Sequence, residues 1–323
     1  MLTDLDAALA RDDVHLASIC AEPERRGPII VRCAEAGKHL YLDKPLCAGV
    51  VEADKIVAAV EKAGVRTQMF SQVHGGPSVR ARELVASGAL GDLVAVHCDL
   101  FFAKGPARHA DLSRPRRESA HPEHYEWVDS KRELSNVGVY PLVFLPWLLG
   151  KEVESVFAVT SNYFFAEHQK NDMEDFGVAL LELEGGLTAT LAVGRAGWRC
   201  HPMSGVNKTY LIGTKGCACI DAYRPRLEVW ADEEPWTAPR RHPDDPMGFW
   251  SSTQEESGTR KKQAWITPAF AGYDDARYFL DCIEQGRESD VPAEAAAAAT
   301  EVLLAAYQSA ATGKEVALPL ARG

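Results

Sequence analysis

Residues 37–46 read Gly-Lys-His-Leu-Tyr-Leu-Asp-Lys-Pro-Leu and decide the fold of the chain. The apolar run over 39–42 predicts a strand, and Gly37 ends the helix before it. Lys44 then lies at the carboxyl end of that strand, where open α/β sheets form their ligand crevice. Pro45 fixes φ and stops the strand. The pattern indicates a lysine that binds a substrate oxygen, with a solvated strand-end lysine as the alternative reading.

Helices and strands alternate around this stretch. Strands are predicted over 14–20, 39–42 and 65–70. One intervening helix opens at Arg26 or Pro28 and the next covers 51–63, because apolar residues there recur at helical spacing. Strand and helix repeat every ~25 residues, which is the rhythm of βαβ units and predicts a parallel sheet over residues 1–71.

The pattern changes over residues 72–323. Strands follow one another with few helices between them, which favours an antiparallel sheet. They are predicted over 93–102, 153–164, 175–183, 187–194, 207–213, 217–221 and 226–231, with helices over 77–87, 136–149, 273–286 and 294–312. Two polar stretches, 103–133 and 232–268, are predicted as long loops, which are often functional. The chain is therefore expected to form two domains, 1–71 and 72–323, of α/β and α+β class.

Composition narrows the function classes. The 323 residues carry a net charge of −11, which argues against a nucleic-acid partner. No apolar run reaches the ~18 residues of a membrane span, and the acidic start is unlike a secretory signal. The eight cysteines contain no Cys-x-x-Cys pair, so we expect no metal site and a reducing, cytoplasmic setting.

Four motifs in order resemble the Gfo/Idh/MocA oxidoreductases along nearly the whole chain. They are Ala-Gly-Lys-His at 36–39 with Asp-Lys-Pro at 43–45, the turn at 84–93, Gly-Thr-Lys-Gly at 213–216 and the ending at 303–320. The resemblance implies a Rossmann domain followed by a large, mostly antiparallel open sheet whose exposed face forms homo-oligomers. It also implies hydride transfer between NAD or NADP and a hydroxyl or carbonyl of a sugar-like substrate.

The resemblance assigns catalytic roles to three residues. Lys44 matches the family lysine that contacts the substrate oxygen and the nicotinamide ribose. Tyr140, in Asn-Val-Gly-Val-Tyr-Pro, matches the proton donor or acceptor of one subgroup, and Lys44 would lower its pKa. The alternative is a core tyrosine with a locally bonded hydroxyl. Asn136 stands where the family carries Asp, so negative charge is lost there; altered substrate choice, slower chemistry or no chemistry are all open.

Further site residues are weaker candidates. The expected cofactor contacts are Glu22, Pro23, Arg26, Asp43, Lys44 and Pro45. Asp43 replaces the usual glutamate and keeps a carboxylate, whereas Glu22 and Arg26 also fit a charge pair at a helix start. The expected substrate contacts are Tyr125, Trp127, Lys131 and Arg132, for which a solvated loop is the alternative.

One family feature does not follow any predicted strand: the Gly-x-Gly-x-x-Gly turn that holds the cofactor pyrophosphate. By the resemblance, the chain starts roughly 60 residues late in the Rossmann order, which makes strand 14–20 an exposed sheet edge. A fragment or a displaced start is the leading expectation. Three functions stay open: an NAD(P)-dependent oxidoreductase, a non-catalytic oligomeric binding or scaffold protein, and a redox-neutral sugar enzyme that uses NAD.

Overall fold

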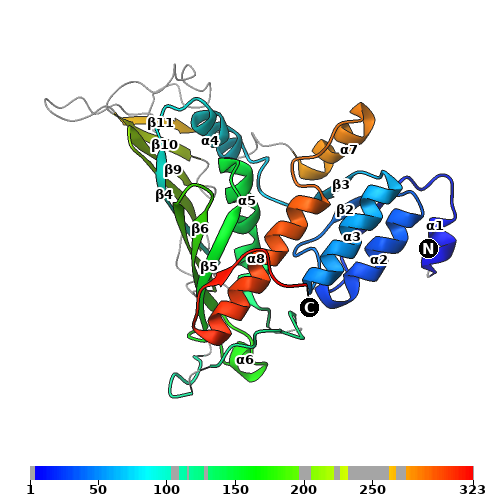
Figure 1. Ribbon diagram of the computed structural model, residues 1–323, viewed down its shortest axis with the longest axis horizontal. Helices are drawn as coiled ribbons and strands as arrows, with labels where there is room; N and C mark the ends of the chain where they lie inside the picture. Colours follow the sequence, from blue (N-terminus) through cyan, green and yellow to red (C-terminus); the bar gives the residue numbers. More distant parts are fainter. Residues whose placement is uncertain are drawn as a thin grey trace, which may run out of the picture.

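The computed structural model describes residues 4–102, 109–114, 116–126, 130–195, 205–221, 226–231, 262–266 and 274–322, without side chains for 226–231 and 262–266. Its described strands form two sheets (Figure 1). The smaller is parallel, in the order β1 (Leu16–Ile19), β2 (His39–Leu42), β3 (Thr67–Met69). The larger has nine strands and is antiparallel except where β4 pairs with β7. The predicted fold class, a Rossmann-like parallel sheet followed by a large, mostly antiparallel sheet, is confirmed.

The three-stranded sheet and its helices form the smaller unit of the structure, and the nine-stranded sheet and its helices form the larger, second unit. The helices of the smaller unit begin and end at recognisable signals. They are α1 (Leu5–Leu9), α2 (Pro23–Glu35) and α3 (Val50–Ala63). Asp4 caps α1 by accepting a hydrogen bond from the amide of Asp6. Gly64 ends α3 with a φ of +63°, a conformation that glycine adopts without strain. The predicted start of α2 at Arg26 or Pro28 is wrong: the helix begins at Pro23, whose fixed φ suits the first helical position.

The nine-stranded sheet has the order β11-β10-β9-β8-β4-β7-β6-β5-β12. Its strands are β4 (Leu93–Phe102), β5 (Val153–Ser161), β6 (Phe176–Leu183), β7 (Leu187–Gly194), β8 (Gly205–Gly213), β9 (Gly216–Asp221), β10 (Arg226–Ala231), β11 (Lys262–Ile266) and β12 (Val316–Ala317). The predicted loop over 232–268 is wrong at β11, because residues 262–266 pair antiparallel with β10; the rest of that stretch lies outside the described residues. The short β12 and α6 (Ala166–Lys170) were not predicted, since each is too brief for a periodic signal.

Helix α8 (Ala293–Thr312) joins the two sheets. It lies between them in Figure 1, with contacts to β5 on one side and to α3 and β3 on the other. Its alanines allow this close approach, and Ala296 and Ala305 have no exposed surface. The remaining helices are α4 (Gly76–Ala86), α5 (Val139–Leu149) and α7 (Asp275–Gln285). The predicted helix 136–149 is split, because a π-helical turn over Leu134–Gly138 precedes α5.

A buried ionic cluster anchors this π-helical turn. The guanidinium of Arg132 donates to Glu118 at 2.9 Å and to Glu174 at 3.1 Å. Glu174 also accepts from the Tyr307 hydroxyl of α8 at 2.7 Å and from the amide of Leu134 at 3.1 Å. Burial and the neighbouring Glu118 raise the pKa of Glu174, which means that they disfavour its charged form. The hydrogen-bond donors around Glu174 offset part of that cost. The cluster therefore fixes where the turn begins.

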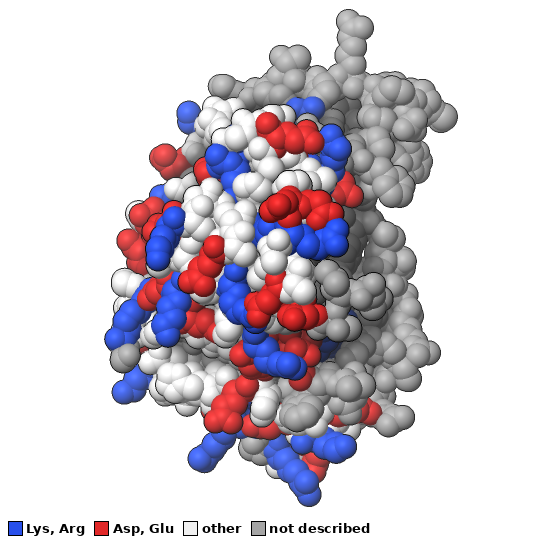
Figure 2. All heavy atoms as spheres, turned by 90° about the vertical axis from the view of Figure 1, so that its right-hand side faces the viewer, with Lys and Arg blue, Asp and Glu red and all other residues white. Residues whose placement is uncertain are grey.

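On the side of α2 and α3, acidic and basic side chains alternate over the surface and do not form separate patches (Figure 2). That distribution offers no continuous basic stripe on this face for a phosphate backbone. Among the described helices, none combines the length and the apolar character needed to cross a membrane.

We predict that Tyr307→Phe lowers the free energy of unfolding by about 2 kcal/mol, because it leaves the buried Ser135 amide without its acceptor and removes one of the two donors to Oε1 of Glu174. Urea denaturation measures the change. Tyr163→Phe is the control, because Tyr163 is 43% exposed. An equal, small effect of both substitutions would contradict the anchoring role of Tyr307.

Candidate functional site

Lys44 leaves the end of β2 and reaches the π-helical turn of the second unit. Its Nζ donates to the backbone oxygen of Asn136 at 2.6 Å and to the Oδ1 atom of the same residue at 2.9 Å. It also lies 5.1 Å from the centre of the Tyr140 ring. An ammonium has three N–H donors, so among the described residues one remains for a ligand. The structure thus brings together Lys44, Asn136 and Tyr140, which are far apart in the sequence.

The Lys44 ammonium is largely removed from water. Burial, opposed by Asp43 and assisted by Lys131, lowers its pKa to about 8. Lys44 therefore changes protonation state close to neutral pH. A lysine tuned in this way can exchange a proton with a bound hydroxyl as well as hold it.

Tyr140 is the second residue of α5, and its ring meets Phe70 edge-on at 6.1 Å between ring centres. Within the described part of the chain, its hydroxyl has no hydrogen-bond partner, whereas the alternative reading required a local one. The expectation that Lys44 lowers its pKa is wrong: burial and then Asp43 raise the pKa of Tyr140 to about 12. The reason is geometric, since the ammonium faces the ring of Tyr140 in a cation–π contact.

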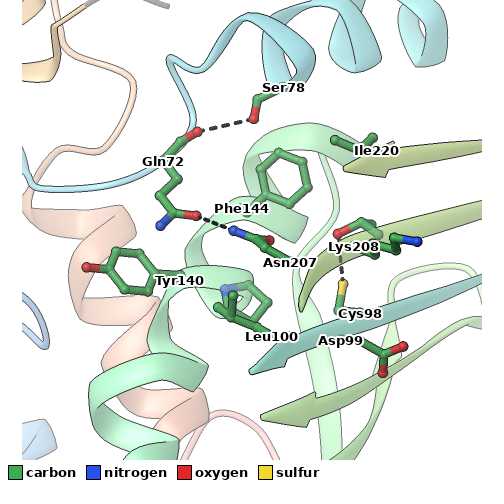
Figure 3. Close-up of a pocket in the computed structure, with 12 residues that line it drawn as sticks. Gln72, Ser78, Cys98, Asp99, Leu100, Tyr140, Phe144, Asn207, Lys208 and Ile220 are labelled. Carbon is green, nitrogen blue, oxygen red and sulfur yellow. Dashed lines mark hydrogen bonds between the residues drawn. The ribbon is translucent and has the colours of Figure 1, made fainter. Parts of the chain in front are cut away.

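Tyr140 also borders a small pocket between α5 and the large sheet (Figure 3). Gln72 and Asn207 meet across this pocket, where Nδ2 of Asn207 donates to Oε1 of Gln72 at 3.1 Å. Ser78 fixes Gln72 by donating to its backbone oxygen at 3.1 Å. Apolar walls come from Cys98, Leu100, Phe144 and Ile220. Sequence reasoning missed both amides, because no motif marks them.

Arg26 holds the segment that carries Lys44. The residue is 1% exposed, and its guanidinium donates to the backbone oxygens of Ala21 at 2.8 Å, of Asp43 at 2.9 Å and of Pro45. It also pairs with the Asp43 carboxylate at 3.3 Å. Asp43 in turn accepts from the Lys44 amide at 2.9 Å. In this arrangement, Arg26 and Asp43 shape the loop.

The other candidates for cofactor contact lie at the same end of the sheet. Glu22 is the N-cap residue of α2 and lies 3.9 Å from Arg25, whereas Arg26 pairs with Asp43, so the alternative of a charge pair between Glu22 and Arg26 is wrong. Pro23 is the buried first residue of that helix, and the Lys44–Pro45 bond is cis. Direct cofactor contact by these residues stays a prediction.

The candidates for substrate contact are mostly engaged elsewhere. Tyr125 is 1% exposed, and its amide donates to Glu24 at 2.6 Å. Lys131 pairs with Glu126 at 2.9 Å, and Arg132 belongs to the buried ionic cluster. Trp127 lies outside the described residues. The structure brings Lys131 near Lys44 electrostatically, and it places Tyr125 and Arg132 in packing roles.

A buried carboxylate behind Asn136 was missed by sequence reasoning. Glu133 is fully buried and accepts a hydrogen bond from the Asn136 side chain at 3.1 Å. Arg195 and His168 contact its other oxygen, at 2.9 Å and 3.2 Å. The spacing of three residues between Glu133 and Asn136 is a helical neighbour signal, whereas nothing in the sequence connects His168 or Arg195 to them.

The residues present fit the nicotinamide end of a cofactor by their chemistry: one unused ammonium N–H and one unpartnered phenol converge from two units. In the part of the chain that the structure describes, no group of three or more His, Cys, Asp or Glu side chains is arranged to hold a metal ion.

Comparisons with known proteins agree with the fold described above. A model described as "Oxidoreductase family, NAD-binding Rossmann fold" matches residues 1–71, and the "GFO/IDH/MocA C-terminal domain" matches residues 78–219. The chain is 30% identical over 228 residues to dTDP-3,4-didehydro-2,6-dideoxy-alpha-D-glucose 3-reductase of Streptomyces violaceoruber, which covers 68% of this chain and 58% of that protein. It is 26% identical over 230 residues to trans-1,2-dihydrobenzene-1,2-diol dehydrogenase of Mus musculus, covering 70% and 59%. The match thus spans less than two thirds of either relative.

A solved structure shows the same fold. Levoglucosan dehydrogenase in complex with NADH and levoglucosan superimposes with a TM-score of 0.75 at 17% identity, covering 99% of this chain and 84% of that one.

We predict that Arg26→Met lowers the free energy of unfolding by about 3 kcal/mol, because three backbone oxygens around Lys44 lose a charged donor. Arg25→Met is a matched control on the same helix, since the Arg25 side chain is 78% exposed. Thermal denaturation compares the two. A loss of equal size in both variants would remove the loop-shaping role of Arg26.

Proposed function

Because the chain belongs to the Gfo/Idh/MocA family of oxidoreductases, we propose that it transfers hydride between a nicotinamide cofactor, NAD or NADP, and a hydroxyl or carbonyl group of a sugar, polyol or related small molecule. One observation carries the proposal. The Lys44 ammonium lies over the Tyr140 ring, with one N–H of the former and the hydroxyl of the latter left for a ligand.

The two side chains divide the proton chemistry. When bound, the cofactor supplies the acceptor or donor of the hydride. Lys44 binds the substrate oxygen through its third N–H and stabilises the negative charge that develops there. With a pKa of about 12, Tyr140 is protonated at neutral pH and can give its proton to that oxygen during carbonyl reduction. During hydroxyl oxidation, the same phenol oxygen takes the proton back, while protonated Lys44, the form that dominates below about pH 8, stabilises the negative charge on the substrate oxygen.

The lining of the pocket beside Tyr140 favours a substrate with several oxygen-bearing groups. Gln72 and Asn207 offer amide donors and acceptors, and apolar side chains surround them. The two relatives are named for a dideoxy-glucose nucleotide with two ring carbonyls and for a dihydrodiol with two ring hydroxyls, so both names describe ring compounds with neighbouring oxygens. The pocket, of about 30 Å³, has room for one hydroxyl-sized group of such a substrate and not for its ring.

The large sheet exposes an apolar patch on one face. Its face away from α5 and α8 exposes apolar side chains in cross-strand pairs, Phe157 with Leu180 and Val159 with Val178. Leu180 is 47% exposed and Val159 is 53% exposed. Because the same face on two copies is self-complementary, we propose that it forms a homo-oligomer.

We predict that Lys44→Ala and Tyr140→Phe each lower turnover by about 10²- to 10⁴-fold, since each removes a group that holds or moves the substrate proton. Formation or consumption of NAD(P)H is followed with a panel of sugars and diols. Lys55→Ala and Tyr163→Phe are the exposed controls, and circular dichroism checks folding. Unchanged turnover in a folded Lys44→Ala variant would overturn the proposed function.

We predict that Leu180→Lys shifts the protein toward monomer in sedimentation velocity, because it places a charge in the middle of the proposed interface. Leu112→Lys is the control, since Leu112 is 67% exposed but lies outside the sheet. The interface is ruled out if the unmodified chain is a monomer, or if both variants sediment like it.

A further inference from the structure

Glu133 is the buried end of a chain of polar contacts that leads to Lys44. Its side chain has no exposed surface. Oε2 accepts from Nδ2 of Asn136 at 3.1 Å, and Oε1 is contacted by Nε of Arg195 at 2.9 Å and Nε2 of His168 at 3.2 Å. Asn136 then accepts from Nζ of Lys44 through Oδ1 at 2.9 Å. One amide side chain therefore separates a buried carboxylate from the proposed catalytic ammonium.

This chain fixes the orientation of Asn136. An ionised carboxylate only accepts hydrogen bonds, so the side-chain NH₂ of Asn136 must face Glu133. The side-chain oxygen of Asn136 is thereby turned toward Lys44. A carboxylate behind an amide also polarises it and strengthens the acceptor at its other end.

We propose that Glu133 is the positioning residue for Lys44, and that it supplies through the Asn136 amide the negative charge that residue 136 itself does not carry. Relatives with Asp at this position would hold that charge next to the lysine. Here the charge lies three residues earlier in the same turn. Where it concerns turnover, this inference rests on the proposed function.

The surrounding charges make Glu133 suitable for this role. Burial alone would raise its pKa, but His168, Arg195 and Asn136 together hold the pKa below its usual range, so the carboxylate is ionised. Lys44 also faces Asp43, Lys131 and Glu126. Lys131 is paired with Glu126, and Asp43 with Arg26.

The sign of the Glu133 contribution follows from its charge. A nearby negative charge favours the protonated form of a lysine, so Glu133 raises the pKa of Lys44 against the effect of burial. Glu133→Gln keeps the shape and removes the charge. The pKa of Lys44 should then fall below about 8, and less of it remains protonated at neutral pH.

Competitive labelling with acetic anhydride over a pH series, read at Lys44 by mass spectrometry, measures this pKa without any cofactor. We expect a lower pKa in Glu133→Gln than in the unmodified protein. Asp290→Asn is the matched control, because it removes a carboxylate that contacts a different buried histidine, His74. An unchanged Lys44 pKa in folded Glu133→Gln would overturn the positioning role.

A double variant separates charge from structure. In Asn136→Asp with Glu133→Gln, the new amide at 133 can donate to the new carboxylate at 136 and accept from Arg195. The negative charge then lies on residue 136, which contacts Lys44 directly. We expect the pKa of Lys44 to return to about 8 or above. If Glu133→Gln does not fold, this double variant carries the test alone. If the pKa of Lys44 in the double variant is as low as in Glu133→Gln, then Glu133 acts only as a structural group, which contradicts the proposal.

Turnover distinguishes this inference from the proposed function. In Glu133→Gln, the limb of the kcat–pH profile that reports Lys44 should move to lower pH, with about a fivefold lower kcat for carbonyl reduction near pH 8 if the pKa falls by about one. A shifted labelling curve without turnover in any variant, including the unmodified chain, would leave the positioning role standing and remove the oxidoreductase function. Turnover with an unshifted labelling curve would support the oxidoreductase function and remove the positioning role.

Discussion

The hydrogen bonds between the Lys44 ammonium and Asn136 join the two units of this protein at its candidate site. Lys44 follows β2 of the parallel sheet, and Asn136 lies in the π-helical turn that packs against the large sheet, so the site exists only while the two sheets hold their relative positions. Arg26 secures the first side by gathering the backbone oxygens around Lys44. Helix α8 secures the arrangement as a whole, because its alanine surfaces pack against both units.

The π-helical turn is the second half of this constraint. Its first amides are bonded by side chains from elsewhere: Leu134 donates to Glu174, and Ser135 donates to the Tyr307 hydroxyl. The Arg132 cluster lies on one side of the turn and the Glu133 cluster on the other, so two adjacent residues of opposite charge enter two different buried networks. Such turns are rare and often mark functional sites, because they re-aim a side chain at the expense of regular hydrogen bonding. Here the side chain is Asn136.

The sequence predicts the parts of the site that have local signals. The strand ending in Asp-Lys-Pro places Lys44, the apolar run after Gly138 places Tyr140, and regular spacing places both sheets. It does not predict the environment of these groups. Tyr140 has a raised pKa because of burial and Asp43, and Arg26 and Arg132 lie in packing positions, all of which depend on three-dimensional contacts. Glu133, His168 and Arg195 meet from three separate segments, so no local motif connects them.

The central claim, that these side chains serve a nicotinamide-dependent reaction, is tested most directly by cofactor binding. Calorimetric titration of the 323-residue chain with NAD⁺, NADH, NADP⁺ and NADPH gives the affinity and the preferred cofactor in one series. The account predicts that at least one of the four binds with a dissociation constant in the micromolar range. No heat of binding for any of them up to millimolar concentration would contradict it.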